Sequence, residues 1–285
     1  MTPLSVWVAL SLIRGMGSRT LKALIAAYNG DFEAVLHADE SALRQVRGVG
    51  PKIADAVRHL NLAQVEQRLT RWQAAGVEVL TLHDPRYPAR LRALDDAPAT
   101  LFKLGTDTLT PPPKAIAIVG TRRPTPEGLA CAAHAAHLAV ESGYAIVSGL
   151  ALGIDSTAHL AASAYTMRQF GVLGGGVLRL YPPENRALAQ AVQANGALVC
   201  EVAPDVPVSA SGLVSRNRII SGLADAVIVV ESETDGGAMY AAMFARRQAR
   251  PVYTFDLKAS GNRALLAEGA LALTLETQAF PQPSL

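Results

Sequence analysis

The chain has 285 residues, of which 50% are hydrophobic and 18% charged, and its formal net charge is only +2. This length and hydrophobic content allow one large core and a small second domain. The weak basic balance excludes a histone-like protein, so cations that bind a nucleic acid would have to be gathered locally. No signal segment opens the chain and no apolar stretch reaches the ~20 residues that span a bilayer, so we expect a cytoplasmic protein without a membrane partner.

Residues 1–76 have the pattern of a helical segment. Apolar residues such as Leu10, Ile13, Leu21 and Leu24 recur at helical spacing, and glycines interrupt them. We predict a small all-helical domain here, of the helix-hairpin-helix or SAM-like kind.

Within this segment, Leu43–Ala54 has the form of a helix-hairpin-helix, and an earlier stretch from residue 14 to residue 19 repeats its Gly-x-Gly turn with basic flanks. Backbone N–H groups at such a turn and at the following helix N-terminus can bind a phosphate. The candidate residues for this secondary DNA contact are Arg44, Arg47, Gly48, Gly50 and Lys52. The alternative, that these glycines only form tight corners between helices, stays open.

Residues 77–113 are predicted to be a connector that carries the first extended segments of a sheet domain. A short strand is expected at Val77–Leu80. A proline-rich stretch follows and ends in Pro111-Pro112-Pro113, which cannot lie inside a helix or a central strand.

Short apolar runs alternate with longer helical patterns over residues 114–278. The predicted strands are Ala115–Val119, Ala145–Ser148, Phe170–Leu173, Leu198–Glu201, Ala226–Val230, Val252–Phe255 and Leu271–Leu275. The predicted helices are Pro126–Ser142, Asp155–Ala164, Glu184–Ala194, Arg216–Gly222, Gly237–Arg247 and Asn262–Glu268. This alternation predicts an α/β fold with a parallel sheet covered on both faces, whose ligand crevice lies at the carboxyl ends of the strands. Residues 279–285 resemble a linker-like tail.

The loop after the first predicted strand of this region is the strongest candidate for phosphate binding. It reads Gly120-Thr121-Arg122-Arg123, where the glycine allows close approach to the backbone and the arginines supply planar cations. A solvated turn is the alternative. Neither Gly-x-Gly-x-x-Gly nor Gly-x-x-x-x-Gly-Lys-Ser/Thr is present, so neither a dinucleotide cofactor nor ordinary ATPase activity is expected.

Further candidates follow later strands. The DNA-binding candidates in these loops are Gly149, Gly153, Gly174, Gly175, Arg216, Asn217 and Arg218. We expect the guanidinium groups of residues 122, 123, 216 and 218 to surround one crevice, whereas scatter over the surface is the alternative. Asp155 and His159 lie on one helix face, and we interpret them as a structural hydrogen-bonded pair because no nucleophile accompanies them. The acidic loop from residue 231 to residue 238 should border the site without holding a strand.

The order of these motifs resembles the DprA (DNA processing protein A, or Smf) family from about residue 87 to residue 269. The resemblance rests on Gly120-Thr121-Arg122-Arg123, Ser148-Gly149-Leu150-Ala151-Leu152-Gly153-Ile154-Asp155, Gly174-Gly175-Gly176, Tyr181-Pro182-Pro183-Glu184-Asn185, Arg216-Asn217-Arg218 and Gly236-Gly237-Ala238. It implies an extended Rossmann-like domain that binds single-stranded DNA, forms a homodimer, protects incoming DNA and loads the RecA recombinase in natural transformation. Single-strand-binding protein is a further implied partner. Thr121 stands where the family has a serine, and Pro182-Pro183 stands where some relatives have a lysine.

The resemblance implies binding without catalysis, and two other functions are alternatives. The first is a nucleoside-monophosphate phosphoribohydrolase, whose Pro-Gly-Gly-x-Gly-Thr-x-x-Glu loop is not matched by residues 231–238. Release of adenine from AMP would reveal that enzyme. The second is a DNA-repair scaffold that uses only the helical hairpins, in which case deletion of residues 1–76 would abolish binding.

Overall fold

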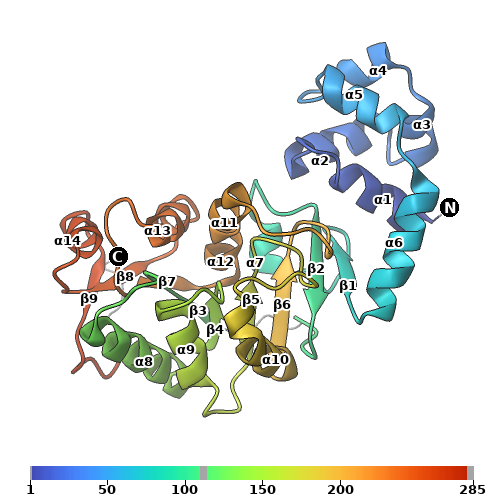
Figure 1. Cartoon of the computed structure of the whole chain (residues 1–285). Helices are drawn as coiled ribbons and strands as arrows, with labels where there is room; N and C mark the ends of the chain where they lie inside the picture. The colour runs from blue at the N-terminus through green and yellow to red at the C-terminus, as the bar shows by residue number, and fades with distance from the viewer. Residues whose placement is uncertain (1, 110–113, 281–285) are drawn as a thin grey trace.

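The computed structural model describes residues 2–109 and 114–280 and shows a helical lobe packed against one end of a larger sheet domain (Figure 1). The lobe consists of α1 (Pro3–Ser11), α2 (Ser18–Ala27), α3 (Phe32–His37), α4 (Glu40–Arg44), α5 (Pro51–Arg58) and α6 (Leu62–Ala74). The expected all-helical N-terminal segment is therefore confirmed.

A sheet of nine described strands runs through the rest of the molecule, in the order β1-β2-β6-β5-β4-β3-β7-β8-β9. The strands are β1 (Glu78–Thr81), β2 (Thr100–Leu104), β3 (Ala115–Val119), β4 (Ala145–Ser148), β5 (Gln169–Val172), β6 (Gly196–Cys200), β7 (Ala226–Val229), β8 (Val252–Phe255) and β9 (Leu271–Leu273). The strands from β3 to β9 pair in parallel, as predicted. β1 and β2 extend the sheet in antiparallel fashion beyond β6.

The strand order reverses direction between β3 and β7, which places a topological switch point there. The chain runs outward from β3 through β4 and β5 to β6, then returns to place β7 on the other side of β3. Loops that follow β3 and β7 diverge at such a point and leave a crevice between them. This feature of the topology positions the candidate site.

Helices cover both faces of the sheet (Figure 1). The remaining helices are α7 (Ala89–Arg92), α8 (Pro126–Glu141), α9 (Ile154–Ala162), the 3-10 helix Pro183–Asn185, α10 (Arg186–Ala194), α11 (Ala210–Ser215), α12 (Asn217–Leu223), α13 (Ala238–Arg247) and α14 (Ser260–Ala267). Ile116 and Ile118 of β3 belong to the core formed with α8 and α9, whereas Ala117 and Val119 belong to the core formed with α12 and α13. This alternation along one strand is the two-residue period of a sheet buried on both sides.

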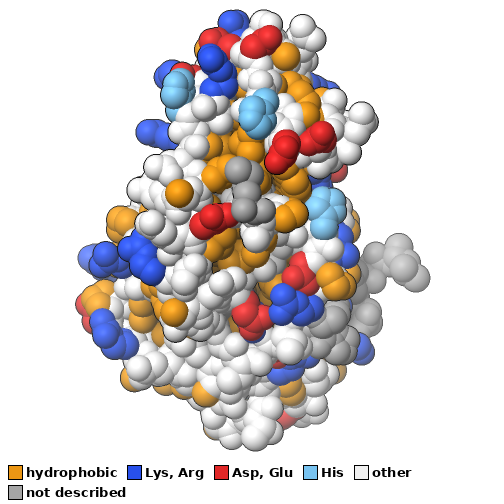
Figure 2. Space-filling view, turned by 90° about the vertical axis from the view of Figure 1, so that its right-hand side faces the viewer, with side chains coloured by type: hydrophobic (Ala, Val, Ile, Leu, Met, Phe, Trp, Pro, Cys, Tyr) orange, Lys and Arg blue, Asp and Glu red, His pale blue; other side chains and the backbone are white. Residues whose placement is uncertain are grey.

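The helical lobe is fixed to the sheet by specific contacts. The indole N–H of Trp7 donates to the carbonyl oxygen of Ala99 and to the hydroxyl of Thr100, both at 3.1 Å. An ion pair of 2.6 Å joins Arg68 of α6 to Asp205. The side view in Figure 2 shows hydrophobic side chains gathered between the helical lobe and the sheet domain.

Cys131 and Cys200 are buried free cysteines. The tripeptide Pro111-Pro112-Pro113 of the predicted connector and residues 281–285 of the predicted tail lie outside the described residues. No helix in the described part of the chain is long and apolar enough to cross a membrane.

Candidate nucleic-acid interface

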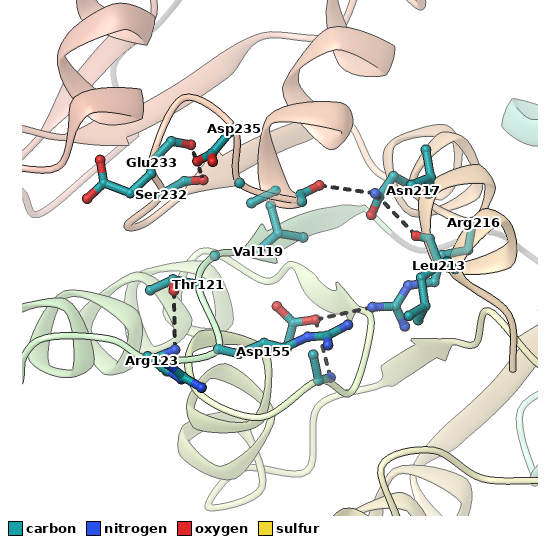
Figure 3. Close-up of a pocket in the computed structure, with 18 residues that line it drawn as sticks. Val119, Thr121, Arg123, Asp155, Leu213, Arg216, Asn217, Ser232, Glu233 and Asp235 are labelled. Atoms are coloured by element: carbon teal, nitrogen blue, oxygen red, sulfur yellow. Dashed lines mark hydrogen bonds and ion pairs between the residues drawn. The ribbon is translucent and has the colours of Figure 1, made fainter.

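A cavity of about 540 Å³ opens at the switch point, between the loops that follow β3 and β7 (Figure 3). α11 and the start of α12 close its third side. Its lining comprises Val119, Gly120, Thr121, Arg122, Arg123, Ala151, Asp155, Ala210, Leu213, Val214, Arg216, Asn217, Ser232, Glu233, Asp235, Gly236, Gly237 and Ala238. The structure thus brings together the first predicted loop and two of the three candidates from the segment 216–218.

The β3–α8 loop is held rigidly by its own backbone and by one carboxylate. The backbone N–H of Thr121 donates to the carbonyl oxygen of Glu231 at 2.8 Å, and the side chain of Glu231 accepts the N–H of Thr125 at 2.9 Å. A Cβ on Gly120 would lie 2.5 Å from the side chain of Ile154, so only glycine fits against α9. Because the loop backbone is fixed, its exposed side chains start from fixed positions at the cavity mouth.

Arg122 and Arg123 are exposed on this loop and line the cavity. Within residues 2–109 and 114–280, neither side chain has an ion-pair partner within 4.0 Å. The hydroxyl of Thr121 accepts the backbone N–H of Arg123 at 3.2 Å, so its oxygen stabilises the turn. Two unpaired guanidinium groups at the mouth of a cavity form a site that can bind phosphate.

Arg216 reaches the same cavity but is buried, with only 7% of its surface exposed. One nitrogen of its guanidinium donates to the carbonyl oxygens of Gly149 and Val172, and the other lies 3.9 Å from Asp155. A Cβ on Gly149 would lie 2.3 Å from this guanidinium. Arg216 therefore holds the β4 and β5 loops together beneath the cavity, and Gly149 is required for that packing.

Asp155 is the acceptor at the centre of this arrangement. Its carboxylate accepts the backbone N–H groups of Gly149 at 3.1 Å and Ala151 at 3.4 Å. Burial raises the pKa of Asp155, and the guanidinium of Arg216 opposes that rise. The expected pair between Asp155 and His159 is wrong, because the Nδ1 of His159 bonds instead to the side-chain oxygen of Gln169 at 2.8 Å.

The predicted convergence of four guanidinium groups is not observed. Arg218 forms an ion pair with Glu201 and does not line the cavity. Residues two positions apart lie on different faces of a helix, so α12 directs Arg216 and Arg218 apart. Between them, Asn217 donates to the carbonyl oxygen of Gly237 at 3.2 Å and fastens α12 to the start of α13.

The other candidate glycines serve close packing. Gly153 has a φ of +79°, and a Cβ there would lie 2.5 Å from the carbonyl oxygen of Thr121. A Cβ on Gly174 or Gly175 would lie 2.8 Å from the backbone nitrogen of Leu213 or Val208, respectively. Gly174 and Gly175 are thus covered by protein backbone, so the expected open approach for a ligand is not seen there.

Sequence reasoning missed an apolar surface beside Arg122. A smaller cavity shares Arg122 and Arg216 with the main one and is also lined by Leu152 and Tyr181. The side chains of Leu152 and Tyr181 are 40% and 42% exposed. The Tyr181-Pro182 sequence marked this loop, but no local pattern showed that it would lie next to Arg122.

The helical lobe contains a structural repeat with an offset of 33 residues. Gly15 and Gly48 have φ angles of +89° and +91°, and Gly17 and Gly50 are the N-cap residues of α2 and α5, where they make no side-chain cap. Each turn packs on the other hairpin, since a Cβ on Gly15 would contact Ile53 and one on Gly48 would meet Thr20.

The basic candidate residues of the lobe differ in whether their side chains form ion pairs. Arg47 and Lys52 are exposed beside the second turn, whereas Arg44 pairs with Glu40 at 3.5 Å. Arg14 and Arg19 occupy the equivalent positions in the first hairpin, where Arg19 pairs with Asp95 at 3.1 Å.

The fold and the site define a Rossmann-like α/β protein with a helix-hairpin-helix lobe. The chain belongs to the DprA/Smf family: the model of DNA recombination-mediator protein A matches residues 78–281, and a helix-hairpin-helix model matches residues 5–66.

Known relatives agree with this assignment. The chain is 36% identical to the DNA processing protein DprA of Bacillus subtilis over 210 residues, which cover 72% of this chain and 71% of that protein. It is 33% identical to the protein Smf of Synechocystis over 282 residues, or 95% of this chain and 70% of the relative.

Two solved structures are similar to this chain. The DprA structure from Streptococcus pneumoniae matches with a TM-score of 0.82 and 25% identity, covering 96% of this chain and 95% of that one. The DprA structure from Helicobacter pylori, described for its single-stranded DNA binding mode, matches with a TM-score of 0.64 and 27% identity over 70% of this chain and 92% of that one.

Proposed function

We propose that this chain is a non-catalytic recombination mediator that binds single-stranded DNA in the switch-point cavity. The observation that carries the proposal is the pair of exposed, unpaired guanidinium groups of Arg122 and Arg123 at the cavity mouth. The rigid loop fixes the backbone of both arginines before a strand arrives, which reduces the entropic cost of binding. The single-stranded DNA binding of the Helicobacter pylori relative supports the same ligand.

The strand is expected to bind mainly through its phosphates. Arg122 and Arg123 would contact them directly, and Arg216 would act from below by fixing the β4 and β5 loops. The exposed ring of Tyr181 offers one face on which a base could stack. With aromatic residues at 5% of the chain, stacking contributes less than charge, and affinity should fall steeply with salt.

The wider role follows from the family. A recombination mediator acts between a DNA strand and a recombinase, so we propose that a cytoplasmic homodimer protects incoming single strands and loads RecA during natural transformation. Single-strand-binding protein would be displaced or contacted in that process.

A second DNA contact is proposed for the helical lobe. The paired hairpins present equivalent turns, and the exposed Arg47 and Lys52 flank one of them. A turn of this kind with free cations beside it suits non-sequence-specific contact with a phosphate.

The test is a salt-dependent titration of single-stranded oligonucleotides with the wild type and the variant Arg122→Ala. Loss of one direct phosphate contact should weaken binding roughly tenfold and reduce the slope of log K against log salt by about 0.7. Arg247→Ala is the matched control, because Arg247 is also exposed but lies at the far end of α13. If Arg122→Ala and Arg247→Ala bind as the wild type does, the cavity is not the binding site.

A further inference from the structure

The switch-point cavity carries charges of both signs on opposite sides (Figure 3). Arg122 and Arg123 lie on the β3–α8 loop, whereas Asp235 lies across the cavity on the loop between β7 and α13. In the described part of the chain, Asp235 has no ion pair or hydrogen bond to its side chain. A ligand with negative charge alone would use one side of the cavity and be repelled by the other.

Asp235 is the carboxylate of this cavity that is exposed to a ligand and whose two oxygen atoms accept no hydrogen bond within the described residues. One oxygen of the Glu233 carboxylate is occupied, since its Oε2 accepts the backbone N–H of Ser260 at 3.0 Å and also the Ser260 hydroxyl. Asp155 is buried and accepts backbone N–H groups. Asp235 is exposed and lines the cavity directly.

The loop that carries Asp235 is fixed before any ligand arrives. The N–H of Ser232 donates to the side chain of Asn262 at 3.0 Å, and its carbonyl oxygen accepts the N–H of Gly261 at 2.9 Å. The N–H of Thr234 donates to Ser260 at 3.1 Å. These bonds tie the loop to the start of α14, so the backbone that carries Asp235 is ordered before a ligand binds.

We propose that Asp235 accepts hydrogen bonds from nucleobases, so that the cavity favours bases that carry an exocyclic amino group. This inference rests on the proposed function. A nucleotide within a DNA strand has no free hydroxyl, and its hydrogen-bond donors are therefore the N–H groups of its base. Uracil also has a donor, its N3–H, but that group lies between two carbonyl oxygens that repel a carboxylate, whereas cytosine presents an amino group in place of one of those oxygens. The arginines hold the phosphates while Asp235 selects among the bases.

The experiment compares oligo(dC) with oligo(dU) of equal length at pH 8, where cytosine is unprotonated. These strands differ in base chemistry at the position that Asp235 would read. The wild type should bind oligo(dC) about threefold to tenfold more tightly, as expected for one charged hydrogen bond at an exposed site. In Asp235→Ala the two affinities should become equal, and the affinity for oligo(dU) should rise because a repulsive charge is gone.

Asp256→Ala is the matched control. Asp256 is an exposed acid that directly follows β8 at the same edge of the sheet, but it does not line the cavity. Its removal should leave the dC-to-dU ratio unchanged. Equal binding of both strands by the wild type, or an unchanged ratio in Asp235→Ala, overturns the base preference while single-strand binding itself survives. Failure of the wild type to bind either strand overturns the proposed function and the preference together.

Discussion

Arg122 and Arg216 show how burial decides what a charged side chain can do. Both are arginines that line one cavity, and both were candidates for phosphate contact. Arg122 is exposed, whereas the guanidinium of Arg216 donates hydrogen bonds to the carbonyl oxygens of Gly149 and Val172. The sequence identifies the residue type and its place after a strand, but burial depends on segments far apart along the chain.

His159 carries the clearest pH dependence. Burial lowers the pKa of His159 from 6.5 to about 4, so its imidazole stays neutral in the folded protein. The unfolded chain binds the extra proton as the pH falls below its ordinary pKa, and the folded state therefore loses stability between pH 6.5 and pH 4. We expect a loss of about 2 kcal/mol between pH 7 and pH 5 from this residue.

Urea unfolding at the two pH values measures this effect. The loss of unfolding free energy between the two pH values is assigned to His159 if it disappears in His159→Gln and persists in His37→Gln. His37 is the control because it is exposed on α3. A wild type and a His159→Gln variant with the same pH dependence would contradict the assignment.

At the scale of elements, the parallel strands and the edge strand β1 could be predicted, whereas β2 and the antiparallel pairing could not. β3, β4 and β7 are continuous apolar runs, and their limits agree with prediction to within a residue. β2 and α7 lie in a proline-rich stretch where local pattern favours a connector, and their structure depends on pairing with β6 and packing on α12. The burial of Gly174 and Gly175 could not be predicted for the same reason, because the segment that covers them lies more than thirty residues later in the chain.

Gly153 offers a test of how one turn supports the Arg122 loop. Gly153 and Gly143 both have positive φ, of +79° and +77°, but a Cβ on Gly143 would meet nothing within 4 Å. The Gly143→Ala variant should lose about 1–2 kcal/mol from the backbone conformation, and Gly153→Ala at least as much, because the ψ of −124° at Gly153 lies outside the left-handed helical region. Gly153→Ala should lose more, and should also weaken single-strand binding, because its Cβ would displace the backbone of Thr121.

Denaturant unfolding and oligonucleotide titration of the two variants separate these effects. Equal losses of stability, with unchanged DNA affinity in both, would mean that the β3–α8 loop adjusts without moving Arg122.

At the scale of the whole molecule, the sheet cavity and the helical lobe would form two DNA contacts on one rigid body. The lobe is anchored to the sheet through Trp7 and Arg68, so the contacts keep a fixed separation. Two linked sites raise the affinity only for a ligand long enough to reach both. The repeated Gly-x-Gly turn of the hairpins was visible in the sequence, but the anchoring of the lobe was not, because it joins residues far apart along the chain.

A length series of single-stranded oligonucleotides tests this arrangement. Short strands should bind through the cavity alone, and affinity should rise once a strand can also reach the lobe. Arg47→Ala or Lys52→Ala should remove that rise without changing the binding of short strands, whereas Arg58→Ala, at the other end of α5, should leave both unchanged. If the lobe variants weaken short and long strands alike, the hairpins are the primary DNA site and the cavity is secondary.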